Sequence, residues 1–146
     1  MDRELLLQAV ALGHSSTCDR GDSGCVVARD GRVLATGYAC SPPGGETCDR
    51  VGHMLIEVRR DGAVHRHCSR TIHAEQRAIA EAARFGIPLG GATFYSTTEP
   101  CSTCARLIAC VGAGGVIAAR SHHGSIEAST ILAEAGIPLK VICRIG

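Results

Sequence analysis

The order of apolar and polar positions along the chain divides it into helix-like and strand-like segments. Apolar residues recur at helical spacing from Leu5 to Leu12, and Gly13 supplies a stop, which predicts a helix over residues 2–12. Two β-rich runs, 24–28 and 32–38, are separated by an Asp-Gly pair, which predicts an antiparallel hairpin. Further along, the pattern predicts helices over 71–85, 102–111 and 126–135, and strands over 92–96, 115–119 and 139–143.

This alternation of strands and helices favours an α/β fold, in which helices cover a central sheet of about five strands. A chain of 146 residues is long enough for one hydrophobic core and short for two. We therefore expect residues 1–146 to form a single domain.

Residues 39–70 follow neither pattern. The segment contains two prolines and two adjacent glycines, then a mixture of cysteine, histidine and charged residues, with only a brief apolar run over 54–58. Structureless segments of this length are uncommon in compact domains unless they are functional or held by another interaction. We expect a Cys/His-rich insertion here.

Charge and aromatic content argue against a nucleic-acid polymer as the partner. The formal net charge is +1, and the densest basic cluster, between Arg59 and Arg70, is interrupted by Asp61 and apolar residues. Aromatic residues make up 3% of the chain and tryptophan is absent, which leaves few side chains for stacking on bases. A small-molecule substrate is therefore expected.

The N-terminus and the cysteine content bear on the cellular location. Residues 1–13 mix Asp, Arg and Glu with a short leucine run, unlike a signal peptide or a membrane span. Nine cysteines cannot all pair internally, and in a reducing compartment a metal or catalytic role is more usual than a disulfide framework. We expect a cytoplasmic, zinc-binding protein with no membrane partner.

Two short motifs supply a candidate metal site. His73 and Glu75 lie near the start of one predicted helix, and Cys101 and Cys104 lie at the start of the next. Two thiolates spaced in this way and one imidazole can bind a zinc ion through three protein ligands, which leaves the fourth tetrahedral position open. The positive ends of the helices favour the thiolate forms of the cysteines. An open position indicates a catalytic metal.

Glu75 stands two residues from the candidate ligand His73, close to the metal without having to bind it. We expect it to act as general base and then general acid, moving protons from water to the substrate and to the leaving ammonia. The pairing of H-x-E with P-C-x-x-C is the sequence signature of zinc-dependent nucleobase deaminases. The alternative is a non-catalytic zinc-binding module, in which a fourth protein ligand would fill the open position.

Longer segments resemble the cytidine and deoxycytidylate deaminase superfamily, and within it the dCMP deaminases. The matching segments are residues 18–27, GYACSPPGG at 37–45, HCSRTIHAEQRAI at 67–79 and LAEAGI at 132–137. The resemblance implies a three-layer α-β-α sandwich around a five-stranded mixed sheet, commonly assembled as a homo-oligomer. It also implies a zinc-dependent hydrolase that acts on the C–N bond of a cytosine-type base.

The resemblance implies dCMP as the substrate, with Arg20, Arg70 or Arg77 available to bind its phosphate. Three departures from the dCMP deaminase pattern bear on the substrate: Ala39 and then Cys40 stand where an asparagine is expected to contact the sugar, and Arg77 stands where an asparagine is usual. The third is a tyrosine-rich stretch of the family, which is replaced by Ala118, Arg120, His122 and His123. In addition, Glu99 is similar to deaminases of adenosine in tRNA, guanine or riboflavin precursors. The alternative is a deaminase of another small amino-heterocycle, such as a free or modified cytosine, an azacytosine, or a purine base or nucleoside.

The resemblance also implies a second, structural zinc ion. Cys18, Cys48, His53 and Cys68 match positions where many bacterial dCMP-type deaminases carry ligands. His53 replaces a cysteine in the familiar C-x4-C spacing, and imidazole is an equally good zinc ligand. A four-ligand site would brace the 39–70 insertion, which has too few apolar residues to offset its ordering entropy. The alternative is a loop with unpaired cysteines.

Overall fold

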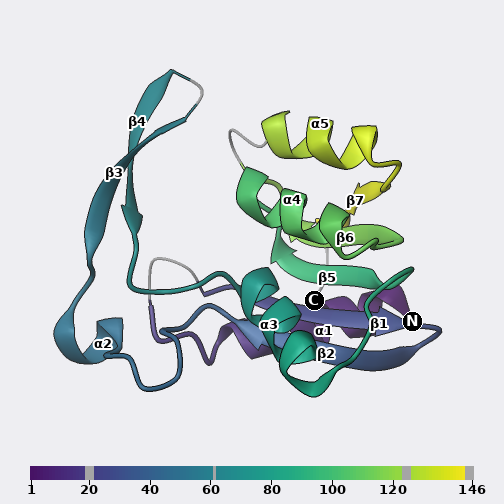
Figure 1. The fold of residues 1–146 in the computed structure, drawn as a ribbon, viewed down its shortest axis with the longest axis horizontal. Coiled ribbons are helices and arrows are strands. Elements are labelled where there is room, and N and C mark those ends of the chain that lie inside the picture. The colour runs from purple at the N-terminus through teal and green to yellow at the C-terminus, as the bar shows by residue number, and fades with distance from the viewer. Residues whose placement is uncertain (19–21, 61, 123–125, 144–146) are drawn as a thin grey trace.

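A five-stranded mixed sheet forms the centre of the protein (Figure 1). The computed structural model describes residues 1–18, 22–60, 62–122 and 126–143. The strand order is β2-β1-β5-β6-β7; β1 is antiparallel to β2 and β5, whereas β5, β6 and β7 are parallel. The strands are β1 (Gly24–Arg29), β2 (Arg32–Tyr38), β5 (Thr93–Thr98), β6 (Gly115–Arg120) and β7 (Leu139–Val141). The mixed sheet expected from the sequence is confirmed.

Helices cover both faces of this sheet, which confirms the three-layer arrangement (Figure 1). On one face lies α1 (Asp2–Gly13). On the other lie α3 (Ala74–Phe85) and α4 (Ser102–Cys110), and α5 (Ile126–Glu134) packs against α4. The longest of these helices have 12 residues, and no helix among the described residues is long and apolar enough to cross a membrane.

The alternation of side chains along the strands divides the core into two layers. Val27 and its cross-strand partner Phe94 are fully buried beneath α3, α4 and α5. Their neighbours Val26 and Tyr95, which also pair across β1 and β5, face α1 instead. Leu6 of α1 is fully buried against this second layer. Both faces of the central strands are therefore covered.

The segment 39–70 differs from the expectation of an irregular insertion. It contains a short helix α2 (Cys48–Val51) and two antiparallel strands, β3 (Leu55–Arg60) and β4 (Ala63–Cys68). The β3–β4 hairpin projects away from the five-stranded sheet (Figure 1). It was missed because its apolar residues, such as Ile56 and Val64, are exposed and few, although the Asp-Gly pair at 61–62 repeats the turn signal at 30–31.

Helix α3 begins three residues later than the sequence predicts, and this start positions a functional side chain. His73 is the N-cap residue, in an extended conformation with φ −74° and ψ 156°. Its backbone N–H donates to Oε1 of Gln76 at 2.8 Å, which completes a capping box. Gly86 ends the helix in the left-handed region, with φ 66°. The His73 side chain is therefore fixed at the helix entrance.

Candidate active site

His73, Cys101 and Cys104 come together where α3 and α4 begin. Cys101 is the N-cap residue of α4, and Cys104 lies in the first turn of that helix. The Nδ1 atom of His73 is 3.3 Å from Sγ of Cys104 and 3.4 Å from Sγ of Cys101. The structure thus brings together the three side chains that the sequence motifs predicted as catalytic metal ligands.

The spacing of these donor atoms fits a zinc ion. All three lie within 4.8 Å of one another. Zinc bonds of about 2.0–2.1 Å to nitrogen and about 2.3 Å to sulfur, at tetrahedral angles, place nitrogen and sulfur about 3.6 Å apart. The separations of 3.3 and 3.4 Å are close to that value. The mixed imidazole and thiolate set is also one that zinc prefers.

The two cysteines of this group differ in acidity. The hydrogen bond from Cys104, together with His73, lowers the pKa of Cys101 to about 3. The same contact with Cys101, together with burial, raises the pKa of Cys104. Because zinc binds thiolates, metal binding at this site displaces the proton of Cys104.

Glu75 lies in the first turn of α3 and is only 6% exposed. Burial raises the pKa of its carboxyl group, while its own backbone N–H and His73 act in the opposite direction. A carboxyl group whose pKa is raised by burial takes up a proton more readily than an exposed one, which suits a group that transfers protons. Glu75 lines the same cavity as His73 and Cys101.

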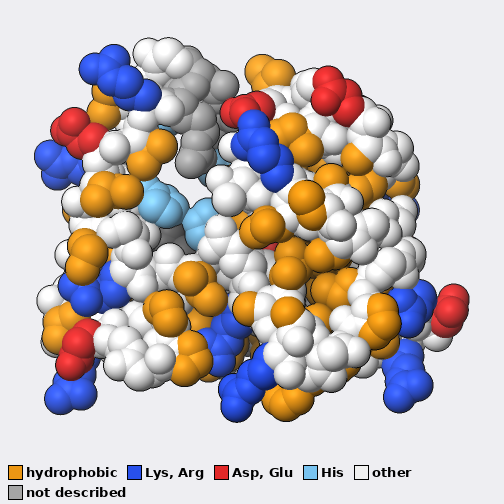
Figure 2. Space-filling view, in the orientation of Figure 1, with side chains coloured by type: hydrophobic (Ala, Val, Ile, Leu, Met, Phe, Trp, Pro, Cys, Tyr) orange, Lys and Arg blue, Asp and Glu red, His pale blue; other side chains and the backbone are white. Residues whose placement is uncertain are grey.

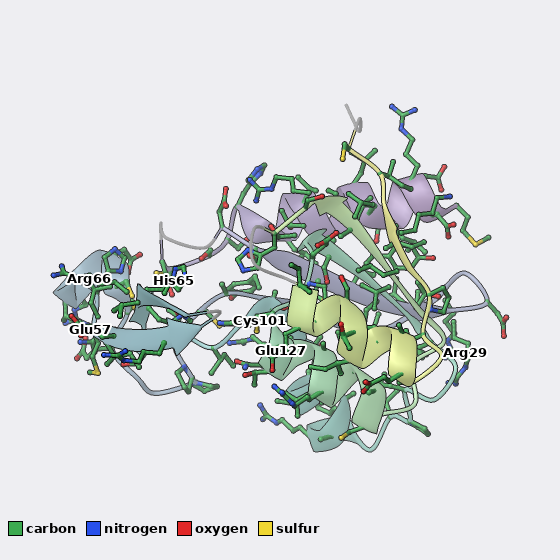
Figure 3. All side chains as sticks on the ribbon, turned by 90° about the horizontal axis from the view of Figure 1, so that it is seen from above. Arg29, Glu57, His65, Arg66, Cys101 and Glu127 are labelled. Carbon is green, nitrogen blue, oxygen red and sulfur yellow. The ribbon has the colours of Figure 1, made fainter. Side chains whose placement is uncertain are left out.

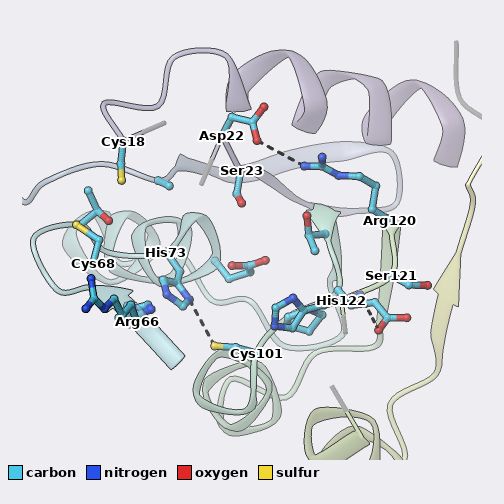
Figure 4. Close-up of a pocket in the computed structure, with 17 residues that line it drawn as sticks. Cys18, Asp22, Ser23, Arg66, Cys68, His73, Cys101, Arg120, Ser121 and His122 are labelled. Atoms are coloured by element: carbon cyan, nitrogen blue, oxygen red, sulfur yellow. Dashed lines mark hydrogen bonds and ion pairs between the residues drawn. The ribbon is translucent and has the colours of Figure 1, made fainter. Parts of the chain in front are cut away.

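This cavity has a volume of about 480 Å³ and opens at the carboxyl ends of β5 and β6. Figure 2 shows histidine side chains around the hollow between the hairpin and the main body. Several lining residues were absent from the sequence-based site, although residues that follow parallel strands commonly form ligand sites. They are Asp22, Glu99, Arg120 and Ser121, with Arg66 and His67 of β4 (Figure 4).

Two of the three arginines expected to bind a phosphate, Arg70 and Arg77, lie outside the cavity lining. Nε of Arg70 donates to the backbone oxygen of Gly52 at 3.0 Å. Nη1 of Arg77 donates to Sγ of Cys40 at 2.7 Å, and its guanidinium lies over the Tyr38 ring, 5.1 Å from the centroid. Neither arginine lines the cavity. Arg20, the third of these predicted residues, lies outside the described residues.

A second group of metal-binding side chains lies where the hairpin joins the main body. Cys18, Cys48, His53 and Cys68 place one donor atom each within 4.8 Å of one another. Sγ of Cys18 is 3.4 Å from Nδ1 of His53, and Sγ of Cys48 is 3.5 Å from Sγ of Cys68. These separations approach the edges of a tetrahedral zinc site, so the four residues fit a closed structural site.

The thiols of this second group differ in acidity. Burial and the contacts with Cys68 and Cys18 raise the pKa of Cys48 to about 12. Burial acts in the same direction on Cys68, but hydrogen bonds with the backbone of Met54 and Arg70 and with Cys48 outweigh it and lower the pKa of Cys68 to about 6. One thiolate is therefore available at neutral pH to begin metal binding.

The fold and the first site together define a class of protein. A His-Cys-Cys metal set, an adjacent buried glutamate and an open cavity at the carboxyl ends of the strands form the arrangement of the zinc-dependent nucleobase deaminases. The family model of the cytidine and deoxycytidylate deaminase zinc-binding region matches residues 1–120. The chain belongs to the cytidine and deoxycytidylate deaminase family, whose metal is zinc.

Two relatives are aligned with this chain over most of their own length. The deoxycytidylate deaminase of Mycobacterium phage D29 is 35% identical over 122 residues, which span 80% of this chain and 91% of the relative. ComE operon protein 2 of Bacillus subtilis is 34% identical over 137 residues, which span 94% of this chain and 68% of the relative. These matches include the H-x-E and C-x-x-C region, since they cover most of the chain.

A solved structure confirms the fold independently. The dCMP deaminase from cyanophage S-TIM5, determined in complex with dCMP and dUMP, superposes with a TM-score of 0.74. The alignment covers 93% of this chain and 92% of that chain, at 24% sequence identity. At this identity the likeness supports the α-β-α architecture.

Proposed function

We propose that this protein is a zinc-dependent hydrolase that removes the 4-amino group of dCMP, giving dUMP and ammonia. The observation that carries the proposal is the buried carboxyl group of Glu75 in the cavity that also contains His73 and Cys101. The substrate is supported by relatives named deoxycytidylate deaminases, among them those of phages D29 and T2.

In this mechanism His73, Cys101 and Cys104 would hold the zinc ion, which would act as a Lewis acid and lower the pKa of water. The carboxylate of Glu75 accepts a proton from the attacking water and gives it to N3 of the cytosine ring, next to the attacked carbon. A second proton transfer through Glu75 allows the amino group to leave as ammonia. One water molecule is consumed for each ammonia released, and Glu75 returns to its initial state.

The experiment is an ammonia-release assay with zinc-loaded protein over dCMP, deoxycytidine, cytosine, adenosine and guanine. We expect the highest kcat/KM for dCMP. Turnover of a free base or nucleoside without turnover of dCMP would favour the amino-heterocycle alternative and refute the proposal. A protein that holds zinc but releases no ammonia from any of these compounds would instead be a non-catalytic zinc-binding module.

We also propose that Cys18, Cys48, His53 and Cys68 hold a structural zinc ion. The support is that their four donor atoms all lie within 4.8 Å of one another and that the three cysteines are buried. A two-stranded hairpin is marginal in water by itself, so a bound metal at its base would supply stability that side-chain packing does not. Metal analysis of the purified protein is expected to find about two zinc ions per chain.

We also propose that the protein is cytoplasmic. All nine cysteines are unpaired in the structure, which suits the reducing cytoplasm.

We further propose that the protein forms a homo-oligomer. The apolar side chains of Leu55, Ile56 and Val64 in the hairpin are between 41% and 52% exposed, and such apolar surface is suited to a contact between copies of the chain. Analytical ultracentrifugation would test the oligomer, and a monomer at assay concentrations would refute it.

A further inference from the structure

The end of β4 forms a positively charged wall of the cavity. Arg66 and His67, consecutive residues of this strand, both line it. The ring centroid of His67 is 5.3 Å from that of His73, so this wall adjoins the metal-binding residues. In Figure 4, Arg66 lies on the side of the cavity that carries His73 and Cys68.

The opposite wall is less suited to an anion. Nη2 of Arg120 lies 3.5 Å from Oδ1 of Asp22, so this guanidinium already has a carboxylate beside it. Glu99 also lines the cavity, where Oε2 accepts from the backbone N–H of His122 at 3.5 Å. This side carries the carboxylates of Asp22 and Glu99, whereas on the β4 side Arg66 and His67 offer a guanidinium and an imidazole that can donate hydrogen bonds to an anion.

The base must lie near Glu75 and the metal-binding residues for the reaction to occur, so the phosphate of a nucleotide must contact another part of the wall of the same cavity. An arginine can donate two parallel hydrogen bonds to phosphate oxygens, and a histidine ring adds an N–H donor. Resting on the proposed function, we propose that Arg66 and His67 form the subsite for the 5′-phosphate. They thereby set the preference for the nucleotide over the nucleoside.

The second metal-binding group gives this subsite its position. Cys68 follows His67 directly in the sequence and is the buried end of β4, in contact with Cys48. Among the other described side chains of the hairpin, Val58 and His67 are half-buried, and the rest of residues 55–59 and 63–66 are exposed. The covalent neighbour Cys68 therefore anchors Arg66 and His67, which reduces the conformational entropy lost when a phosphate binds.

The test compares Arg66→Gln and His67→Gln with the control His65→Gln. His65 lies on the same strand (Figure 3). It is exposed and does not line the cavity. We expect Arg66→Gln to lower kcat/KM for dCMP by about 10- to 100-fold, mainly through KM, because a charge-assisted hydrogen bond is lost. His67→Gln should lower it by about 3- to 10-fold. The kcat/KM for deoxycytidine should change less than about twofold in both variants, since only the phosphate contact is removed.

An equal loss for dCMP and deoxycytidine, or an unchanged preference for dCMP, would overturn this inference and leave the proposed function standing. Wild-type protein that ignores dCMP would overturn both. Zinc content and circular dichroism show whether a variant has folded. If Arg66→Gln does not fold, Arg66→Lys takes its place, because lysine keeps the charge but cannot donate two parallel hydrogen bonds. For Arg66→Lys we expect a smaller loss of kcat/KM for dCMP than for Arg66→Gln. The variant should also bind dUMP more weakly than the wild type does, with the binding of deoxyuridine unchanged. A loss shared with the nucleosides would count against the subsite.

Discussion

The Sγ atom of Cys101 lies 3.4 Å from Nδ1 of His73, although the two residues are 28 positions apart in the sequence. Both residues are N-caps, His73 of α3 and Cys101 of α4, and the two helices pack on the same face of the sheet. The contact therefore depends on where each helix begins. Changes that move either helix start are expected to affect metal binding.

Replacement of Glu75 tests the proposed proton transfer. Glu75→Gln keeps the size of the buried side chain but cannot accept a proton, so kcat/KM should fall by at least about 100-fold, the range for lost general acid–base catalysis. Zinc content should stay unchanged, because Glu75 is not one of the proposed ligands. The exposed Glu4 of α1 offers a control, and Glu4→Gln should leave the rate intact. Full activity in Glu75→Gln would contradict the mechanism.

Replacement of Cys48 tests the structural metal. In Cys48→Ser we expect the zinc content to fall from about two ions to about one per chain, and hydrogen exchange over residues 55–68 to accelerate. Since β4 carries the cavity wall, KM for dCMP should also rise. Cys143, which is exposed and outside both metal-binding groups, provides the matched control Cys143→Ser. Retention of two zinc ions in Cys48→Ser would contradict the assignment.

Replacement of Gly37 tests whether the close approach of β2 and α3 is needed for stability and metal binding. A Cβ atom at this position would lie 2.3 Å from the backbone oxygen of Ala74 and 2.7 Å from the backbone nitrogen of Ala78. Gly37→Ala must push α3 outward, so we expect a loss of about 1–3 kcal/mol in the free energy of unfolding and weaker zinc binding at His73. Denaturant unfolding and chelator competition measure these two effects.

Gly90→Ala provides the comparison for Gly37, because the nearest atom to its added Cβ is 4.0 Å away. This variant should unfold within about 0.5 kcal/mol of the wild type. If both glycine variants behaved alike, the close packing of α3 on β2 would not be what positions the site.

The environment of Tyr95 leads us to expect that the free energy of unfolding falls at alkaline pH. Its hydroxyl donates to Oδ1 of Asp2 at 2.7 Å, and burial together with this carboxylate raises the pKa of Tyr95 to about 12. In the unfolded chain a tyrosine titrates near about 10, so the stabilisation is present below pH 10 and is lost as the pH rises towards 12. Unfolding free energies measured from pH 8 to 12 should decline over this interval.

Tyr95→Phe isolates that contribution. The variant lacks the hydrogen bond and should be about 1 kcal/mol less stable than the wild type at pH 8. The difference should shrink as the pH approaches 12, where the wild type loses the contact through ionisation. A difference that stayed constant across this range would show that Tyr95 does not titrate with a raised pKa.

The local pattern was sufficient to predict most of the main sheet and the helices. Hydrophobic spacing located all five strands and the four longer helices to within a few residues, because each of these elements buries one face of its own sequence. The hairpin formed by residues 55–60 and 63–68 escaped this approach, since its apolar side chains remain largely exposed and its strands bury no continuous face. A pattern based on burial cannot find strands that are not buried.

The chemistry of the site was determined by the sequence alone. The residue types and spacing of His73, Glu75, Cys101 and Cys104 indicate a zinc deaminase without any knowledge of the tertiary structure. Only the tertiary structure decided which other side chains line the cavity. It directed Arg77 towards Cys40 and placed Arg66 in the cavity. Metal ligands form short local motifs, whereas a cavity wall is assembled from segments whose proximity depends on how the whole sheet and its helices pack.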